Sequence, residues 1–238
     1  CPSNPSCFCA IDSVASLASI RPAGPCPVAT PQPLSVSILI ATSIFTAAVA
    51  EVFMPSFKPF FEGATGKAPY DYQARLAGGD DGVRCESQLI SIPTGLGKTA
   101  AVVLAWLWNR VVRGDDSWPR RLVYCLPMRA LVEQTRDEVT KWIANVLKSA
   151  DSLPLSTEAR ERLEWLVAHS PIILMGGEEN DPARRVWDIH PERPAILIGT
   201  QDMLLSRALN RGYGVGRARW PMHFGLLNND ALWVLDDT

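Results

Sequence analysis

Short apolar runs rich in Val, Ile and Leu recur along the chain from residue 87 onward. They do not alternate strictly between apolar and polar residues, a pattern typical of strands that are buried on both faces of a parallel sheet. The runs that we expect to form strands are Gln88–Pro93, Arg121–Pro127, Pro171–Met175, Ala195–Gly199 and Ala231–Asp236.

Helical patterns separate several of these runs. Within Ala130–Lys148, apolar residues recur at spacings of three and four, which gives a helix one core-facing stripe. Lys98–Val112, Thr157–His169 and Gln201–Asn210 are the other predicted helices. Alternating strands and helices predict an α/β fold with a mostly parallel sheet flanked by helices.

The first 50 residues differ in composition from the rest. They hold two charged side chains, four of the six cysteines and seven of the nineteen prolines. We therefore expect 1–50 to be a low-charge extension, disordered or mistranslated, and 51–238 to be the globular lobe. The uncharged run Leu34–Ala50 is at the short limit of the roughly 17–25 residues that cross a bilayer, and Ser and Thr dilute it, so we expect no membrane contact.

Few other features of composition narrow the function. A net charge of −2 shows no global basic bias, so contacts with nucleic acid must come from local groups. Isolated Cys85 and Cys125 suit a reducing, cytoplasmic compartment. The eight tryptophans lie among apolar neighbours and are expected in the core. His169, His190 and His223 are isolated and show no metal-binding pattern.

The stretch SIPTGLGKTAAVVLAW (91–106) has the context of a phosphate-binding loop. An apolar strand ends at Pro93, a glycine-containing turn follows, and Lys98 opens a helix whose N–H groups can face an anion. Lys98 would reach the β- and γ-phosphates of ATP, and the Thr99 hydroxyl would ligate Mg²⁺. Pro93 occupies a position where the general pattern has glycine, so a chance Gly-Lys-Thr at a strand–helix turn stays an alternative.

The local form PTGLGKT resembles motif I of the superfamily 2 helicases, and further stretches match that family in order. YDYQ (70–73) resembles the Q-motif, LPMRALVEQT (126–135) motif Ia and MGG (175–177) motif Ib. IGTQDMLLSRAL (198–209) resembles the TQD-type motif that follows, and VLDD (234–237) resembles motif II. HFGLLNNDALWVLDD as a whole resembles the helicase–nuclease of type I CRISPR systems, in the type I-U (I-G) branch. The resemblance covers residues 57–238.

The resemblance implies a first RecA-like lobe that binds ATP and Mg²⁺. Gln73 would recognise adenine, with Tyr70 and Tyr72 beside it. The phosphates would lie on Thr94, Gly95, Leu96, Gly97, Lys98 and Thr99. Thr99 and Asp236 would hold the metal, while Lys98, Asp236 and Asp237 would be catalytic.

The same resemblance implies that Arg129, Gly177, Thr200 and Gln201 contact single-stranded DNA. Each assignment has a structural alternative: Gln73 as a polar residue at a helix start, Arg129 on a solvated face, and Thr200 as an N-cap. The implied activity is ATP-driven 3′-to-5′ translocation and unwinding of DNA in antiviral defence, with a CRISPR surveillance complex as partner.

Two departures from the family pattern bear on activity. Asp237 stands where motif II usually has glutamate, so hydrolysis is expected to be weakened. The sequence stops after motif II, so we expect a chain truncated before the second RecA-like lobe and the nuclease module, impaired alone and with an uncovered strand edge. Alternatives are a non-catalytic ATP- or nucleic-acid-binding remnant and another P-loop NTPase, such as a nucleotide kinase.

Overall fold

The computed structural model describes residues 7–12, 56–151, 153, 155–176 and 182–236. The strands are β1 (Cys7–Asp12), β2 (Gln88–Ser91), β3 (Arg121–Leu126), β4 (Ile172–Leu174), β5 (Ala195–Thr200) and β6 (Ala231–Asp236). The α-helices are α1 (Phe57–Thr65), α2 (Asp71–Ala77), α3 (Lys98–Trp106), α4 (Arg129–Lys148), α5 (Thr157–His169), α6 (Val186–Ile189), α7 (Gln201–Ala208) and α8 (Trp220–Asn228). A π-helix, η1 (Leu107–Val112), continues α3, and three short 3₁₀ turns are η2 (Ser149–Asp151), η3 (Pro182–Arg185) and η4 (Arg217–Arg219).

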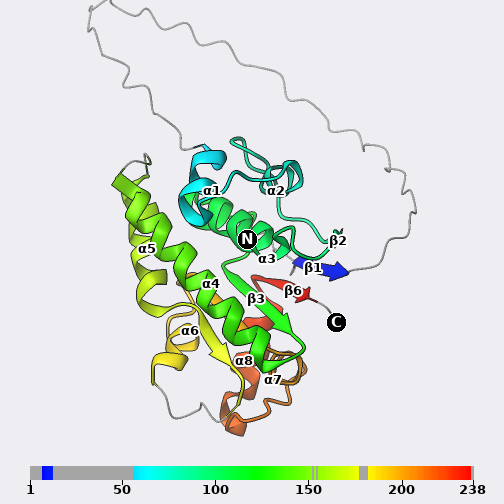
Figure 1. Ribbon diagram of the computed structural model, residues 1–238. Coiled ribbons are helices and arrows are strands. Elements are labelled where there is room, and N and C mark those ends of the chain that lie inside the picture. Colours follow the sequence, from blue (N-terminus) through cyan, green and yellow to red (C-terminus); the bar gives the residue numbers. More distant parts are fainter. Residues whose placement is uncertain (1–6, 13–55, 152, 154, 177–181, 237–238) are drawn as a thin grey trace, which may run out of the picture. The chain divides into compact units, whose positions relative to one another are not determined.

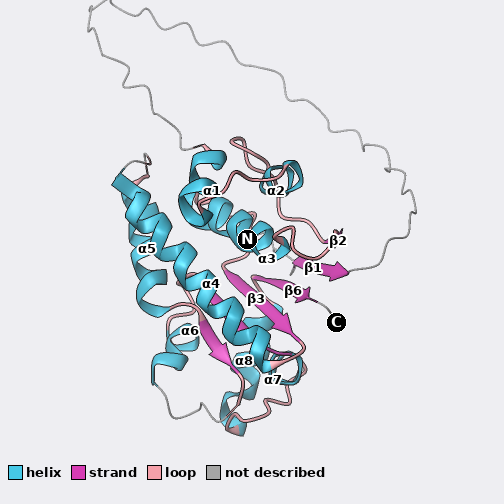
Figure 2. Ribbon diagram, viewed as in Figure 1, coloured by secondary structure: helices cyan, strands magenta, loops and turns pink. Residues whose placement is uncertain are grey.

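The six described strands form one sheet in the order β2-β1-β6-β3-β5-β4 (Figure 1). Every pairing among them is parallel, and helices flank the sheet (Figure 2). This architecture confirms the predicted α/β class and is consistent with a RecA-like lobe. All five predicted strands are present, as β2 to β6.

The alternation of side chains along β3 divides the core into two layers. Leu122, Tyr124 and Leu126 point to the face covered by α1, α3, α4 and α5. Val123 and Cys125 point to the opposite face, where Trp187 of α6, Leu204 of α7 and Leu227 of α8 cover them. Because both faces are covered, β3 to β6 are almost fully buried, which explains their nearly continuous apolar sequences, whereas β2 at the edge is mostly exposed.

The position of β1 corrects the prediction that the first 50 residues stand outside the lobe. Cys7–Asp12 lies inside the sheet, paired with β2 on one side and with β6 on the other. A run of apolar residues with few charges can fill a central parallel strand as well as an extension, and composition alone does not separate the two. The rest of that segment, 1–6 and 13–50, lies outside the described residues, and this includes the apolar run at 34–50.

The motif II strand is not at an edge of the described sheet. The motif II strand, β6, has a partner on each side, β1 and β3, so its edge is covered. The two edge strands of the described sheet are instead β2 and β4. Within the described ranges, no helix combines the length and the apolar character that a membrane crossing requires.

Candidate nucleotide and nucleic-acid sites

The turn between β2 and α3 has the backbone shape of an anion-binding loop. Gly95 and Gly97 take left-handed conformations, with φ of 84° and 74°. Alternating left- and right-handed residues turn successive N–H groups toward one point, which forms a concave site for an anion. The left-handed conformation favours glycine at position 97, and a Cβ there would lie 3.0 Å from Nε2 of Gln73, a tight contact.

Lys98, the first residue of α3, has a buried ammonium group. Its residue exposure is 8%, and Nζ has no hydrogen-bond partner among the described residues. A buried charge without a partner is costly, and polar groups inside proteins are normally paired. The position of this ammonium at the loop therefore fits an anionic ligand such as a nucleotide phosphate.

Helix α2 braces the loop from one side. The Gln73 side chain donates from Nε2 to the carbonyl of Gly97 at 3.0 Å, and its Oε1 accepts from the Tyr70 N–H at 2.9 Å. The Tyr72 hydroxyl donates to the carbonyl of Leu96 at 2.6 Å. Burial, the largest cause, raises the pKa of Tyr72.

The brace limits what Gln73 can offer to a base. An amide has two N–H donors and two oxygen lone pairs, so one donor and one lone pair remain after these two bonds. Gln73 is only 2% exposed. The Tyr70 ring is 55% exposed and stacks on the Tyr72 ring, with centroids 6.2 Å apart and planes 13° apart.

Asp236 ends β6 on the same face of the sheet as the loop. Leu232 and Val234, two and four residues earlier, belong to the core layer that contains α3, so alternation directs Asp236 to that layer. Its carboxylate is buried and accepts a 2.6 Å hydrogen bond from the Tyr124 hydroxyl.

The register of β1 relates Asp236 to the loop. Ile11 pairs with Asp236 on one side and with Ile90 on the other. Adjacent strands lie about 4.8 Å apart, so Asp236 is roughly 10 Å from β2 across the sheet. The loop and the carboxylate thus share the carboxyl edge of the sheet, where ligands bind in open α/β folds.

The donor set around the loop suits a metal shared with a nucleotide. The described residues contain no group of three or more His, Cys, Asp or Glu that could hold a metal. Magnesium commonly takes one or two carboxylates and completes its shell with water and substrate phosphates. Thr99 follows Lys98 at the helix start and, with Asp236, fits that mode. Asp237 lies outside the described residues.

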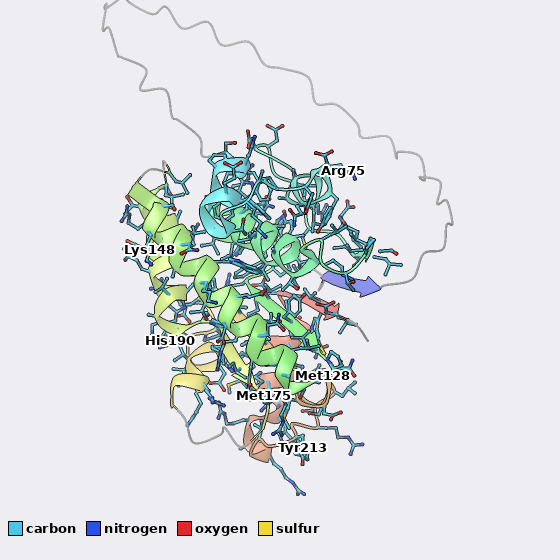
Figure 3. All side chains as sticks on the ribbon, in the orientation of Figure 1. Arg75, Met128, Lys148, Met175, His190 and Tyr213 are labelled. Atoms are coloured by element: carbon cyan, nitrogen blue, oxygen red, sulfur yellow. The ribbon has the colours of Figure 1, made fainter. Side chains whose placement is uncertain are left out.

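A second hollow lies at the carboxyl ends of β3 and β5. It is a groove of about 850 Å³, and three predicted nucleic-acid residues line it: Arg129, Thr200 and Gln201. Met128, Met175 and Tyr213, labelled in Figure 3, line it too. Thr200 occupies the N-cap position of α7 but makes no side-chain cap bond, so capping does not account for its hydroxyl. Gly177 lies outside the described residues.

Sequence reasoning missed a buried ionic cluster between α6 and α8. Nε2 of His223 lies 2.8 Å from Oδ2 of Asp188, and Arg219 forms an ion pair with the same oxygen. His223 is isolated in the sequence, but the fold brings it to Asp188, which lies 35 positions away. The tryptophans fit the core prediction better: Trp106, Trp108, Trp118, Trp187 and Trp233 are buried.

A parallel α/β sheet with a glycine loop, a buried lysine and a strand-end carboxylate defines a P-loop nucleotide-binding domain. A family model for the DEAD/DEAH box helicases matches residues 81–236. The chain therefore belongs to the DEAD/DEAH box helicase family, which uses ATP and acts on nucleic acid. Searches of curated proteins and of solved structures each gave no significant match.

Proposed function

We propose that this chain is the ATP-binding lobe of a single-stranded DNA translocase and helicase that acts in CRISPR antiviral defence. Membership of the helicase family supports ATP-dependent work on nucleic acid. The stretch HFGLLNNDALWVLDD supports the CRISPR setting, through its resemblance to the type I helicase–nuclease. The 3′-to-5′ direction and a surveillance complex as partner follow from that resemblance.

Each candidate residue has a role in this proposal. Lys98 binds the β- and γ-phosphates, and Thr99 and Asp236 hold Mg²⁺, which neutralises charge on the phosphates. The loop from Thr94 to Gly97 surrounds the phosphates with N–H groups. Gln73 keeps the loop in shape and offers its remaining donor and lone pair to adenine.

The nucleic-acid strand lies in the groove at the ends of β3 and β5. Arg129, Thr200 and Gln201 contact its phosphates there, as side chains and helix N-termini commonly do. Gly177 would add a backbone contact. Such contacts carry no sequence information, which suits a motor that must move along any sequence.

The observation that carries the nucleotide proposal is the buried ammonium of Lys98, for which the described part of the chain offers no hydrogen-bond partner. In a thermal-shift assay, Mg-ATP at about 100 times its Kd should stabilise the chain by about 2.7 kcal/mol. Lys98→Met should abolish this stabilisation. The melting temperature of the ligand-free variant should be equal to or higher than that of the wild type, since no unpaired charge is then buried. Lys141→Met, at an exposed lysine of α4, is the matched control and should keep the ATP effect. An ATP effect retained by Lys98→Met would contradict the proposal.

Motor activity needs a second test. ATP turnover should rise when single-stranded DNA is added together with a second RecA-like lobe in trans, because an arginine finger from such a lobe contributes about 10³–10⁵ in kcat. Asp237→Glu should raise turnover further, by up to about 100-fold, since glutamate reaches the attacking water better. ATP binding without turnover under all these conditions would instead indicate a non-catalytic nucleotide-binding protein.

A further inference from the structure

Tyr213 is an exposed aromatic residue beside the nucleic-acid groove. Its exposure is 67%, and it lines the same groove as Arg129 and Gln201. Figure 3 labels it together with Met128 and Met175 of that groove. It lies in the segment between α7 and α8, outside the motifs that carry the helicase resemblance. Large aromatic side chains are normally stabilised by burial, so an exposed ring at a groove is a candidate for contact with a ligand.

The loop that carries Tyr213 has a fixed shape. The carbonyl of Ser206 accepts hydrogen bonds from the N–H groups of Arg211 at 2.7 Å and Gly212 at 3.1 Å. From the other side, the Trp220 indole N–H donates to the carbonyl of Val215 at 2.8 Å. The ring is therefore presented on a braced backbone, and holding it ready reduces the ordering cost of binding.

Gly212 lets the Trp220 ring pack directly against this loop. Its φ is 46°, and a Cβ at this position would lie 2.2 Å from Cδ1 of Trp220. Any side chain there would push the indole away and would strain the backbone. In the sequence Gly-Tyr-Gly, the Tyr213 ring is thus flanked by two residues that have no side chain.

The lining of the groove matches a single-stranded nucleic acid. Met128 and Leu209, exposed at 56% and 72%, add apolar surface beside the tyrosine. Arg129 and Arg211 add two positive charges to the lining, against one carboxylate, Asp202. Proteins that bind single strands combine cationic groups for the backbone with aromatic rings on which bases stack.

We propose that Tyr213 is a stacking residue for a base of single-stranded DNA, while Arg129, Thr200 and Gln201 hold the backbone of the same strand. This inference rests on the proposed nucleic-acid function of the groove. It adds a contact with the bases to contacts that otherwise involve only phosphates. The stacked base need not be of one type, because every base has a π-face.

The test compares two ligands on the full 238-residue chain. One is a fluorescein-labelled oligothymidylate, and the other is an abasic oligonucleotide of equal length and charge. Tyr213→Ala should weaken oligothymidylate binding by about 5- to 100-fold, the range that aromatic stacking on one base supplies. The same variant should bind the abasic strand as the wild type does. Tyr213→Phe should behave as wild type on both ligands, since it keeps the ring.

Arg129→Ala separates the inference from the function on which it rests. This substitution should lower the affinity for both ligands to a similar extent, because a phosphate contact does not depend on the base. Equal weakening of both ligands by Tyr213→Ala would overturn the stacking role and leave the groove as a DNA site. Wild-type protein that binds neither ligand would overturn the nucleic-acid function itself. Folding of each variant is checked by its melting temperature.

Discussion

The hydroxyl of Tyr124 on β3 donates a 2.6 Å hydrogen bond to Oδ2 of Asp236 on the neighbouring strand β6. Tyr124 is fully buried, so the bond fixes the carboxylate from the core side of the sheet. Partners of this kind orient metal ligands, and their loss typically weakens metal affinity by about 10- to 100-fold.

Tyr124→Phe should therefore weaken ATP binding in the presence of Mg²⁺ much more than in EDTA. Titration of a fluorescent ATP analogue under both conditions measures the difference. Tyr213→Phe removes a hydroxyl away from the nucleotide site and is the matched control. Equal affinities of Tyr124→Phe and wild type in Mg²⁺ would contradict a metal-holding role for Asp236.

Gln73 is expected to act both as a brace and as a reader of adenine. Gln73→Ala removes the bond to Gly97 and the remaining amide groups together. Loss of the brace should weaken the binding of ATP and of GTP equally, whereas loss of an adenine contact should weaken the binding of ATP only. We therefore expect ATP affinity to fall more than GTP affinity. Parallel losses would leave Gln73 as a brace alone, and no loss would exclude both roles.

The strand β1 should be necessary for the nucleotide site, because it joins the strand before the phosphate loop to the strand that carries Asp236. Deletion of residues 1–12 should lower the melting temperature and remove the ATP-dependent stabilisation. Deletion of residues 1–6 leaves β1 in place and serves as the control. If both deletion variants have the same melting temperature and the same ATP affinity, β1 is dispensable.

The periodicity of the apolar runs was sufficient to predict most of the sheet. Apolar runs rich in branched residues are typical of parallel strands, and β2 to β6 begin and end within two residues of their predicted limits. Helix α5 has its predicted bounds, Thr157–His169, and in the structure the Ser156 side chain caps its start.

Other features depend on contacts between distant residues, which a single sequence does not reveal. The strand β1 has an apolar sequence that composition assigned to an extension, and only pairing with β2 and β6 identifies its place. Helix α1 is nine residues long and owes its stability to Phe57, Phe60 and Phe61 packing in the core. Tyr213 stands outside every recognisable motif, so its position became evident only with the groove.

The buried cluster of Asp188, Arg219 and His223 should be important for stability. Removing one partner of a buried ion pair typically costs about 3–5 kcal/mol. Asp188→Ala should lower the free energy of unfolding by that amount, as measured by urea denaturation. Asp137→Ala removes an exposed partner of Arg136 on α4 and should have little effect. A similar small effect in Asp188→Ala would show that the cluster adds no stability.

Burial of Cys125 predicts low reactivity and a loss of stability at high pH. Its thiol is fully buried, and desolvation raises its pKa from 9.0 to about 12. Between these two pH values the unfolded chain ionises before the folded chain does, so this contribution to stability is complete below pH 9 and declines toward pH 12.

At pH 8, the folded chain should therefore carry far less Cys125 thiolate than the chain in urea. Peptide mapping after iodoacetamide treatment should find this cysteine at least about 100-fold slower to react when folded. Comparable rates in buffer and in urea would show that the thiol is accessible in the native state.

The partnership between Ile11 and Asp236 spans almost the whole chain. During synthesis, β1 lacks its partner on the β6 side until β6 has been made. Closing so long a loop makes folding slow, because the entropy of the intervening chain is lost before the contact forms. Competence to bind ATP would therefore arise only after β1 and β6, which are far apart in the sequence, have paired.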